Sequence, residues 1–81
     1  MPNAEREQIS VLAMFRDGII EPRRFKKAGC MYDIATINLR YEVKQGRIDV
    51  LYFSVFDGSR THKLVYQTDT HRWYVEEEEW L

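Results

Sequence analysis

The chain has 81 residues, one cysteine and a formal net charge of −1 at pH 7. This length predicts a single domain over residues 1–81 with a modest core, since a chain of about 80 residues buries only roughly 60–65% of its unfolded surface. The lone Cys30 excludes an internal disulfide and favours a reducing compartment. With no signal-peptide pattern and no 18-residue apolar window, the sequence predicts a cytoplasmic protein without a membrane span.

Charge is unevenly distributed along the chain. Residues 16–47 carry eight Lys/Arg against four Asp/Glu, and residues 48–81 carry three against seven, so the two segments have net charges of +4 and −4. This asymmetry fits two alternatives: a basic face with an acidic tail, or two halves that lie side by side so that their charges cancel. The second alternative is favoured, because net charge informs association and not fold.

Five turn signals divide the chain into short segments rich in Val, Ile, Tyr, Phe, Trp and Thr. They are Asp17-Gly18, Ala28-Gly29, Gln45-Gly46, Asp57-Gly58 and Asp69-Thr70. Runs of β-prone residues separated by turns roughly every 8–12 residues are typical of antiparallel strands joined by hairpins. The spacing therefore predicts an all-β fold: an antiparallel meander of five or six strands, curled or closed as a small SH3-like barrel.

The N-terminal segment has two parts. Residues 1–7 are polar and predict a flexible lead-in. Residues 8–15 fit two alternatives, an amphipathic helix or a strand with alternate side chains on one face. The short length of the apolar run and the Asp17-Gly18 turn that follows it favour the strand.

Residues 19–27 predict the second strand. Pro22 has no N–H for a ladder hydrogen bond, so this strand is expected at a sheet edge or with a bulge at that position. Its four basic residues also suit an exposed edge, because charge discourages edge-to-edge aggregation.

Two longer runs predict the centre of the sheet. Residues 32–44 alternate apolar and polar side chains, which predicts one buried and one solvated face and, given the length, a bulge or bend. Residues 48–56 are apolar on both faces, which indicates a central strand whose second face is covered by the N-terminal segment or by a partner subunit. Residues 61–68 and a run from Arg72 predict the last two strands.

Several residue patterns stand out from Pro22 onward. A Pro22-Arg23-Arg24-Phe25 run precedes a Gly turn and Tyr32-Asp33-Ile34, and Arg72-Trp73-Tyr74-Val75-Glu76 precedes Trp80. With this Pro-x-x-Phe strand, Gly-x-x-Tyr-x-Ile hairpin and terminal Trp-Tyr-Val-Glu strand, residues 19–80 resemble a loose group of short bacterial β-domains of unknown function. The resemblance implies a compact bacterial β-domain and supplies no catalytic or binding residues.

Residues suited to catalysis or metal binding are sparse. The chain has Cys30, His62 and His71, without a Cys-x-x-Cys, His-Glu-x-x-His or paired-His spacing. Carboxylates such as Asp57 lie at turns, where Asp favours local backbone hydrogen bonds. The sequence therefore predicts a protein that is not an enzyme, with no catalytic residue, no metal site and no cofactor.

Binding of single-stranded nucleic acid is the alternative function. Small curled β-domains bind single strands with a basic groove and aromatic platforms. The candidate phosphate contacts are Arg23, Arg24, Lys26, Lys27, Arg40, Lys44 and Arg47. A pI of about 6.1 and the glutamate run at 76–79 weigh against this function.

Binding of a protein partner is the favoured function. A central strand that is apolar on both faces and a modest core both indicate a further apolar surface for a partner or a second copy. The candidate contact residues are Tyr52, Tyr74 and Trp80. The sequence thus predicts a cytoplasmic, non-catalytic binding or adaptor domain that contacts an unidentified protein or forms a weak homodimer, without contacting a membrane.

Overall fold

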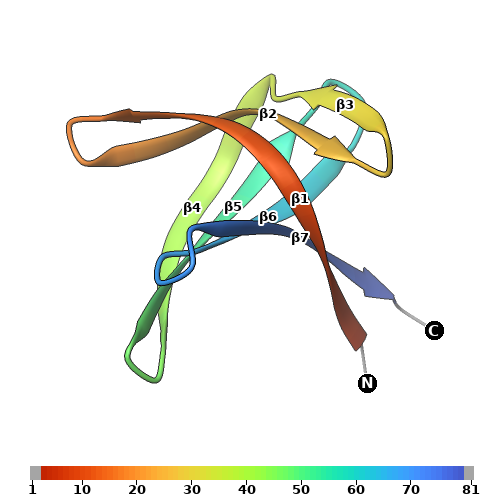
Figure 1. The fold of residues 1–81 in the computed structure, drawn as a ribbon. Helices are drawn as coiled ribbons and strands as arrows, with labels where there is room; N and C mark the ends of the chain where they lie inside the picture. The colour runs from red at the N-terminus through yellow and green to blue at the C-terminus, as the bar shows by residue number, and fades with distance from the viewer. Residues whose placement is uncertain (1–2, 80–81) are drawn as a thin grey trace.

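The computed structural model describes residues 3–79, which form seven β-strands joined by short turns (Figure 1). The strands are β1 (Asn3–Arg16), β2 (Ile19–Lys27), β3 (Cys30–Asp33), β4 (Thr36–Gln45), β5 (Ile48–Phe56), β6 (Thr61–Gln67) and β7 (Arg72–Glu79). The described range contains no helix that is long and apolar enough to cross a membrane. The predicted all-β fold is confirmed.

All seven strands belong to one antiparallel sheet in the order β3-β2-β1-β7-β6-β5-β4. The long strand β1 pairs with β7 over residues 3–9 and with β2 over residues 10–16. Because one strand changes its partner halfway along, the sheet curls instead of lying flat, and β1 arcs across the molecule in Figure 1. The result is a curled half-barrel of seven strands, where five or six were expected.

The additional strand arises where the expected run of residues 32–44 is interrupted. The backbone N–H of Ile34 donates to the carbonyl of Arg23 on β2 at 2.9 Å, and that of Ala35 donates to the carbonyl of Phe56 on β5 at 2.8 Å. These two residues therefore separate β3 from β4 and connect the two outer strands of the sheet. At this end of the half-barrel the two outer strands are joined by the connecting segment and not by a ladder of hydrogen bonds.

The N-terminal segment is a strand and not a helix. Residues 8–15 lie within β1, in agreement with the favoured alternative. The expected lead-in over residues 1–7 overlaps β1 from Asn3 onward, where the backbone pairs with β7. Residues 1 and 2 lie outside the described part of the chain.

The expected irregularity at Pro22 is a β-bulge. Leu12 pairs with Arg24 and the next residue, Ala13, pairs with Pro22, so Arg23 is the extra residue on β2. A bulge accommodates a proline that cannot donate to the ladder. The other alternative, an edge position, holds at Pro22 but not for the whole strand: β2 lies between β1 and β3, but β3 pairs only with Arg24 to Lys27 and not with Pro22.

Strand β4 also has the expected bulge, but its alternation does not bury one face. Ile37 pairs with Val55 and Leu39 pairs with Ser54, which leaves Asn38 as the extra residue. Leu39 is 55% exposed and Tyr41 is 40% exposed. The prediction of a buried apolar face is therefore wrong for these residues, because β4 is the outermost strand and the bulge turns Leu39 to the face opposite Ile37.

The core has two clusters, one on each face of the β5–β6–β7 region. The larger cluster, on what we term the inner face, contains Ile9, Phe25, Phe53, Val55, Leu64, Tyr66, Trp73 and Val75. The smaller cluster, on the opposite face, contains Val50, Tyr52 and Val65. Strand β5 contributes to both, as its two apolar faces predict. The curl brings β2 over the inner face, where Phe25 lies 5.0 Å from the ring of His62 on β6.

Two of the turns have the left-handed backbone that a tight hairpin requires. Asp17 and Gly18 have φ values of 53° and 76°, and Ala28 and Gly29 have values of 50° and 80°. Two successive residues with positive φ form a type I′ turn, whose twist matches that of the flanking strands. Ala28 is an unusual residue for this conformation, since its Cβ opposes a positive φ.

Candidate binding surfaces

The seven basic residues proposed for nucleic-acid binding do not form one patch. Four of them, Arg23, Arg24, Lys26 and Lys27, lie on β2, whereas Arg40 and Lys44 lie on β4 and Arg47 lies in the β4–β5 turn. Four strands separate β2 from β4 in the sheet, and Figure 1 shows the β4–β5 turn at the lower end of the molecule, away from β3. Arg23 and Arg40 do line one small cavity of about 260 Å³. Lys44 pairs with Asp49 at 3.4 Å.

Part of this basic group lies on the face of β1, β2 and β3 that points away from the inner face. We term it the outer face. Its members follow from the pairing register: Ser10, Leu12, Met14 and Arg16 on β1, Ile19, Glu21, Arg24 and Lys26 on β2, and Met31 and Asp33 on β3. Paired residues of antiparallel strands share a face, and alternate residues of one strand do the same.

The outer face is apolar as well as basic. Leu12 is 66% exposed, Met31 is 56% exposed, Ile19 is 47% exposed and Met14 is 40% exposed. The solvated face of an antiparallel sheet normally carries polar side chains, so these four exposed apolar residues depart from the usual pattern. They share this face with the basic residues Arg16, Arg24 and Lys26.

Ion pairs neutralise part of the charge on the outer face. Arg24 is bonded to Asp33, and Arg23 Nη2 lies 3.3 Å from Glu21 Oε2. Arg23 Nη2 also lies 3.8 Å from the sulfur of Met14, so its head group reaches this face from the bulge. With Arg16 and Lys26 included, four positive charges stand against two negative ones. The outer face is therefore net basic.

Of the aromatic residues predicted for partner binding, the two that the structure describes are buried or half-buried. Tyr52 is 6% exposed, and its hydroxyl accepts hydrogen bonds from Arg6 Nη2 at 2.8 Å and from Gln45 Nε2 at 3.2 Å. Its ring stacks on that of Tyr41 with centroids 5.0 Å apart. Tyr74 is half-buried, and Trp80 lies outside the described residues. Tyr52 therefore stabilises the fold and offers little surface to a partner.

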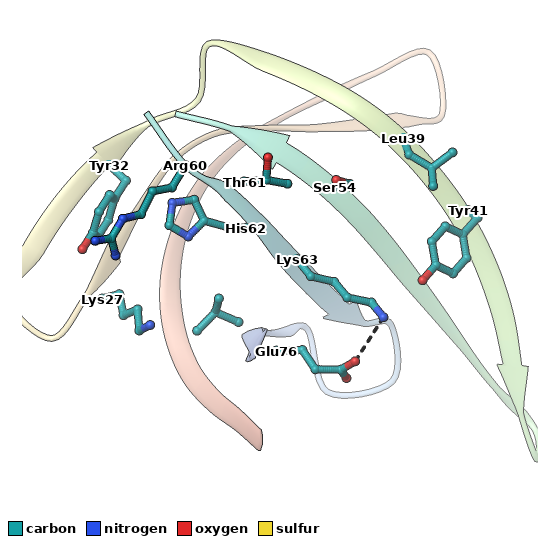
Figure 2. A pocket seen from close by; sticks show the side chains of 11 residues that line it. Lys27, Tyr32, Leu39, Tyr41, Ser54, Arg60, Thr61, His62, Lys63 and Glu76 are labelled. Atoms are coloured by element: carbon teal, nitrogen blue, oxygen red, sulfur yellow. Dashed lines mark ion pairs between the residues drawn. The ribbon is translucent and has the colours of Figure 1, made fainter. Parts of the chain in front are cut away.

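A second candidate site forms where β6 and β7 diverge. Their ladder ends at the pair Lys63–Glu76; beyond it, β7 continues beside β1 while Thr61 and His62 remain paired with β5. The divergence leaves a cavity of about 650 Å³, which we term the β6–β7 hollow (Figure 2). Side chains from β2, β3, β4 and the β5–β6 turn complete its wall.

Among the described side chains that line the β6–β7 hollow, Glu76 is the only carboxylate. It accepts from Arg6 Nε at 2.8 Å and from Lys63 Nζ at 3.2 Å, and its side chain is 9% exposed. Burial by itself would raise the pKa of the Glu76 carboxyl, but the hydrogen bonds and charges of Arg6 and Lys63 outweigh it and lower the pKa. Glu76 is therefore a neutralised anion held between two cations.

His62 enters the wall of the hollow from β6 and is held by Asp57. Asp57 Oδ1 accepts from the backbone N–H groups of Ser59 and Arg60, both at 2.7 Å, and Oδ2 lies 2.8 Å from His62 Nε2. The bond from Arg60 N–H, followed by those from His62 and Ser59, lowers the pKa of Asp57 to about 2. An ionised carboxylate cannot donate, so Nε2 of His62 carries the proton in this contact.

The sequence predicted the hydrogen bonds between Asp57 and the backbone but not its contact with His62. Asp57 was expected to bond to the backbone of its own turn, and it does so. The partnership with His62 was not expected, although the spacing of five residues across a hairpin turn offered a signal. Cys30, one of the three residues considered for catalysis or metal binding, is exposed in β3. Among residues 3–79, no three His, Cys, Asp or Glu side chains are grouped closely enough to hold a metal ion.

In comparisons with known proteins, the chain matches no family model, no curated protein and no solved structure. The resemblance to short bacterial β-domains therefore rests only on the residue patterns from Pro22 onward.

Proposed function

We propose that this protein is a non-catalytic binding domain of the bacterial cytoplasm that docks a protein partner on its outer face. The observation that carries the proposal is the exposure of Leu12, Met14, Ile19 and Met31 on one sheet face. Exposed apolar side chains gathered on one face, with polar residues around them, are a common mark of a protein interface. The fitting partner has an apolar centre with acidic residues around it.

The charge of the outer face favours a different protein over a second copy as the partner. A twofold dimer through this face would bring Arg16, Lys26 and their symmetry mates together. Like charges brought together in an interface cost several kcal/mol, whereas an acidic partner would attract the same residues. Self-association through this face therefore has less support.

Binding of single-stranded nucleic acid also has less support. Non-specific single-strand binding relies on exposed rings on which bases stack. The outer face has no aromatic member, since Phe25 and Tyr32 pair with each other on the inner side, with centroids 4.9 Å apart. Of the remaining basic candidates, Arg40 lines a small cavity with Arg23, whereas Lys44 lies near the end of β4 and Arg47 lies in the β4–β5 turn.

The proposal is tested by site-specific photocrosslinking in cells. We expect a benzoylphenylalanine at position 12 to crosslink one protein in high yield, and the same group at exposed position 69, in the β6–β7 turn, to crosslink none. With the captured partner purified, Arg24→Glu should weaken binding at least tenfold, since it places a like charge against acidic residues. The matched variant Arg72→Glu, also on an exposed arginine, should have little effect.

Two outcomes would overturn the proposal. One is equal crosslinking from positions 12 and 69, which would indicate contact without a preferred face. The other is tight binding of a mixed-sequence single-stranded oligonucleotide that weakens steeply with salt and is lost in Arg24→Glu, which would assign the outer face to nucleic acid.

A further inference from the structure

The β6–β7 hollow has the features of a small-molecule site that is separate from the outer face. We infer that it binds a small organic anion: a molecule with an apolar body and a single carboxylate or phosphate head group. None of the exposed apolar residues of the outer face lines this cavity. The inference therefore does not depend on the proposed partner.

The size and charge of the hollow suit such a ligand. Ligand pockets are typically clefts of roughly 300–1,000 Å³, and the hollow measures about 650 Å³. Among the described side chains of its wall, Lys27, Arg60 and Lys63 are the cations, and Glu76, which pairs with Lys63, is the carboxylate. The whole chain has a net charge of −1, so this concentration of cations is local. Clefts with one sign of charge attract ions of the opposite sign.

The negative charge of Glu76 does not prevent the hollow from attracting an anion. Arg6 and Lys63 both contact this carboxylate, and Arg6 brings a further cation beside it. In Figure 2 the Lys63–Glu76 pair lies at the lower side of the hollow, whereas Arg60 and His62 lie together at the opposite side, near Tyr32. An anionic head group therefore has a cationic side to approach that is away from the carboxylate.

Arg60 and His62 are the residues best placed to receive the head group. The guanidinium of Arg60 can donate two parallel hydrogen bonds to a carboxylate or phosphate. His62 uses Nε2 for Asp57, so Nδ1 is the nitrogen left for a ligand; Nδ1 donates to an anion only in the imidazolium form of the ring. The backbone N–H of Arg60 is fixed by Asp57, which limits the movement of the residue that carries the guanidinium.

The apolar body of the ligand would contact the β4 side of the hollow. Leu39 and Tyr41 extend from β4 into the view in Figure 2, across from Tyr32, and both are exposed. A ligand that covers these exposed apolar side chains removes them from water, which favours binding.

The experiment is an amide-resolved NMR titration of the full chain with three probes of similar size: benzoate, phenyl phosphate and benzyl alcohol. We expect benzoate or phenyl phosphate to bind with a Kd on the order of 1 mM, because a ligand of about ten non-hydrogen atoms has limited binding free energy. The shifts should be confined to Tyr32, residues 39–41 and residues 60–63. Comparison of the two anions identifies the head group, and benzyl alcohol should bind at least fivefold more weakly.

A matched pair of variants tests the head-group contact. Arg60→Gln should weaken binding of the preferred anion about tenfold, the loss expected for one charge-assisted hydrogen bond. Arg72→Gln, which removes an exposed arginine outside the hollow, should leave the Kd within a factor of two. The inference is overturned if benzyl alcohol binds as tightly as both anions, if the shifts lie outside the hollow, or if the two variants behave alike.

Discussion

The Nε2 atom of His62 lies 2.8 Å from Oδ2 of Asp57, and this contact joins the β5–β6 turn to the core. On its other sides the same imidazole packs against Phe25 and Tyr32, with ring centroids 5.0 Å and 5.2 Å away. Asp57 in turn fixes the backbone of Ser59 and Arg60. One carboxylate thus organises a turn, a core ring and one side of the β6–β7 hollow.

This arrangement predicts a specific loss of stability in acid. The folded-state pKa of Asp57, about 2, lies below its ordinary value of 3.8, so its ionised form stabilises the fold above about pH 4. That contribution is lost as the pH falls through 2. The difference in urea midpoint between wild type and Asp57→Asn should therefore be constant from pH 7 to about pH 5 and should narrow towards pH 2. A difference that stays constant down to pH 2 would contradict the assignment.

The same substitution at two leucines should have very different effects. Leu64 is fully buried in the inner-face cluster, whereas Leu39 is 55% exposed on the edge strand. Leu64→Ala should lower the free energy of unfolding by about 2–5 kcal/mol, because it removes buried methyl groups and leaves a cavity. Leu39→Ala should change it by less than about 0.5 kcal/mol. Urea denaturation of both variants checks the result, and equal losses would mean that β4 is not an edge strand.

The β2–β3 turn offers a stabilising substitution. Ala28 has a φ of 50°, a conformation that is more favourable for Asn than for Ala. Ala28→Asn should raise the free energy of unfolding by about 0.5–1 kcal/mol, measured by thermal or urea denaturation. Ala13→Asn in the extended strand β1 is the control and should destabilise the protein, since Asn is disfavoured in strands. A loss of stability in Ala28→Asn would contradict the turn geometry.

Features that depend on neighbouring residues were predictable from the sequence. The Asp17-Gly18 turn follows from two residues that tolerate positive φ. The missing N–H of Pro22 predicts a bulge or an edge position, and the two apolar faces of β5 predict a strand with neighbours on both sides. In each case a few consecutive residues determine the backbone, so no information about distant strands is needed.

Features that depend on distant pairing were not predictable. Alternation in residues 32–44 shows that two faces differ, but it does not show which strand, if any, covers the apolar one. Leu39 and Tyr41 are exposed because β4 has no outer neighbour in the sheet. The hollow likewise exists because the β6–β7 ladder ends at the Lys63–Glu76 pair while β7 stays paired with β1 as far as Glu79, and local sequence does not encode where a ladder between distant strands ends.

Glu76 links the stability of the fold to the charge of the hollow. Glu76→Gln preserves the shape of the side chain but leaves Arg6 and Lys63 without their shared anion. Both cations are about one-third exposed, so solvent screening limits the expected loss to about 1 kcal/mol in the free energy of unfolding. High salt should recover part of it, because the remaining repulsion between the two cations is screened. Glu42→Gln, on exposed β4, should change stability by less than about 0.5 kcal/mol.

The same variant should act in the opposite direction on ligand binding. Removing the Glu76 carboxylate from the wall of the hollow makes the cavity more positive, so Glu76→Gln should bind benzoate or phenyl phosphate more tightly than wild type, by about threefold or more. NMR titration under native conditions measures this change separately from the loss of stability. A variant that is less stable and yet binds the anion better would show that Glu76 holds the strands together at the expense of affinity. Weaker binding in Glu76→Gln would mean instead that the Arg6–Glu76–Lys63 cluster positions the cations that meet the ligand.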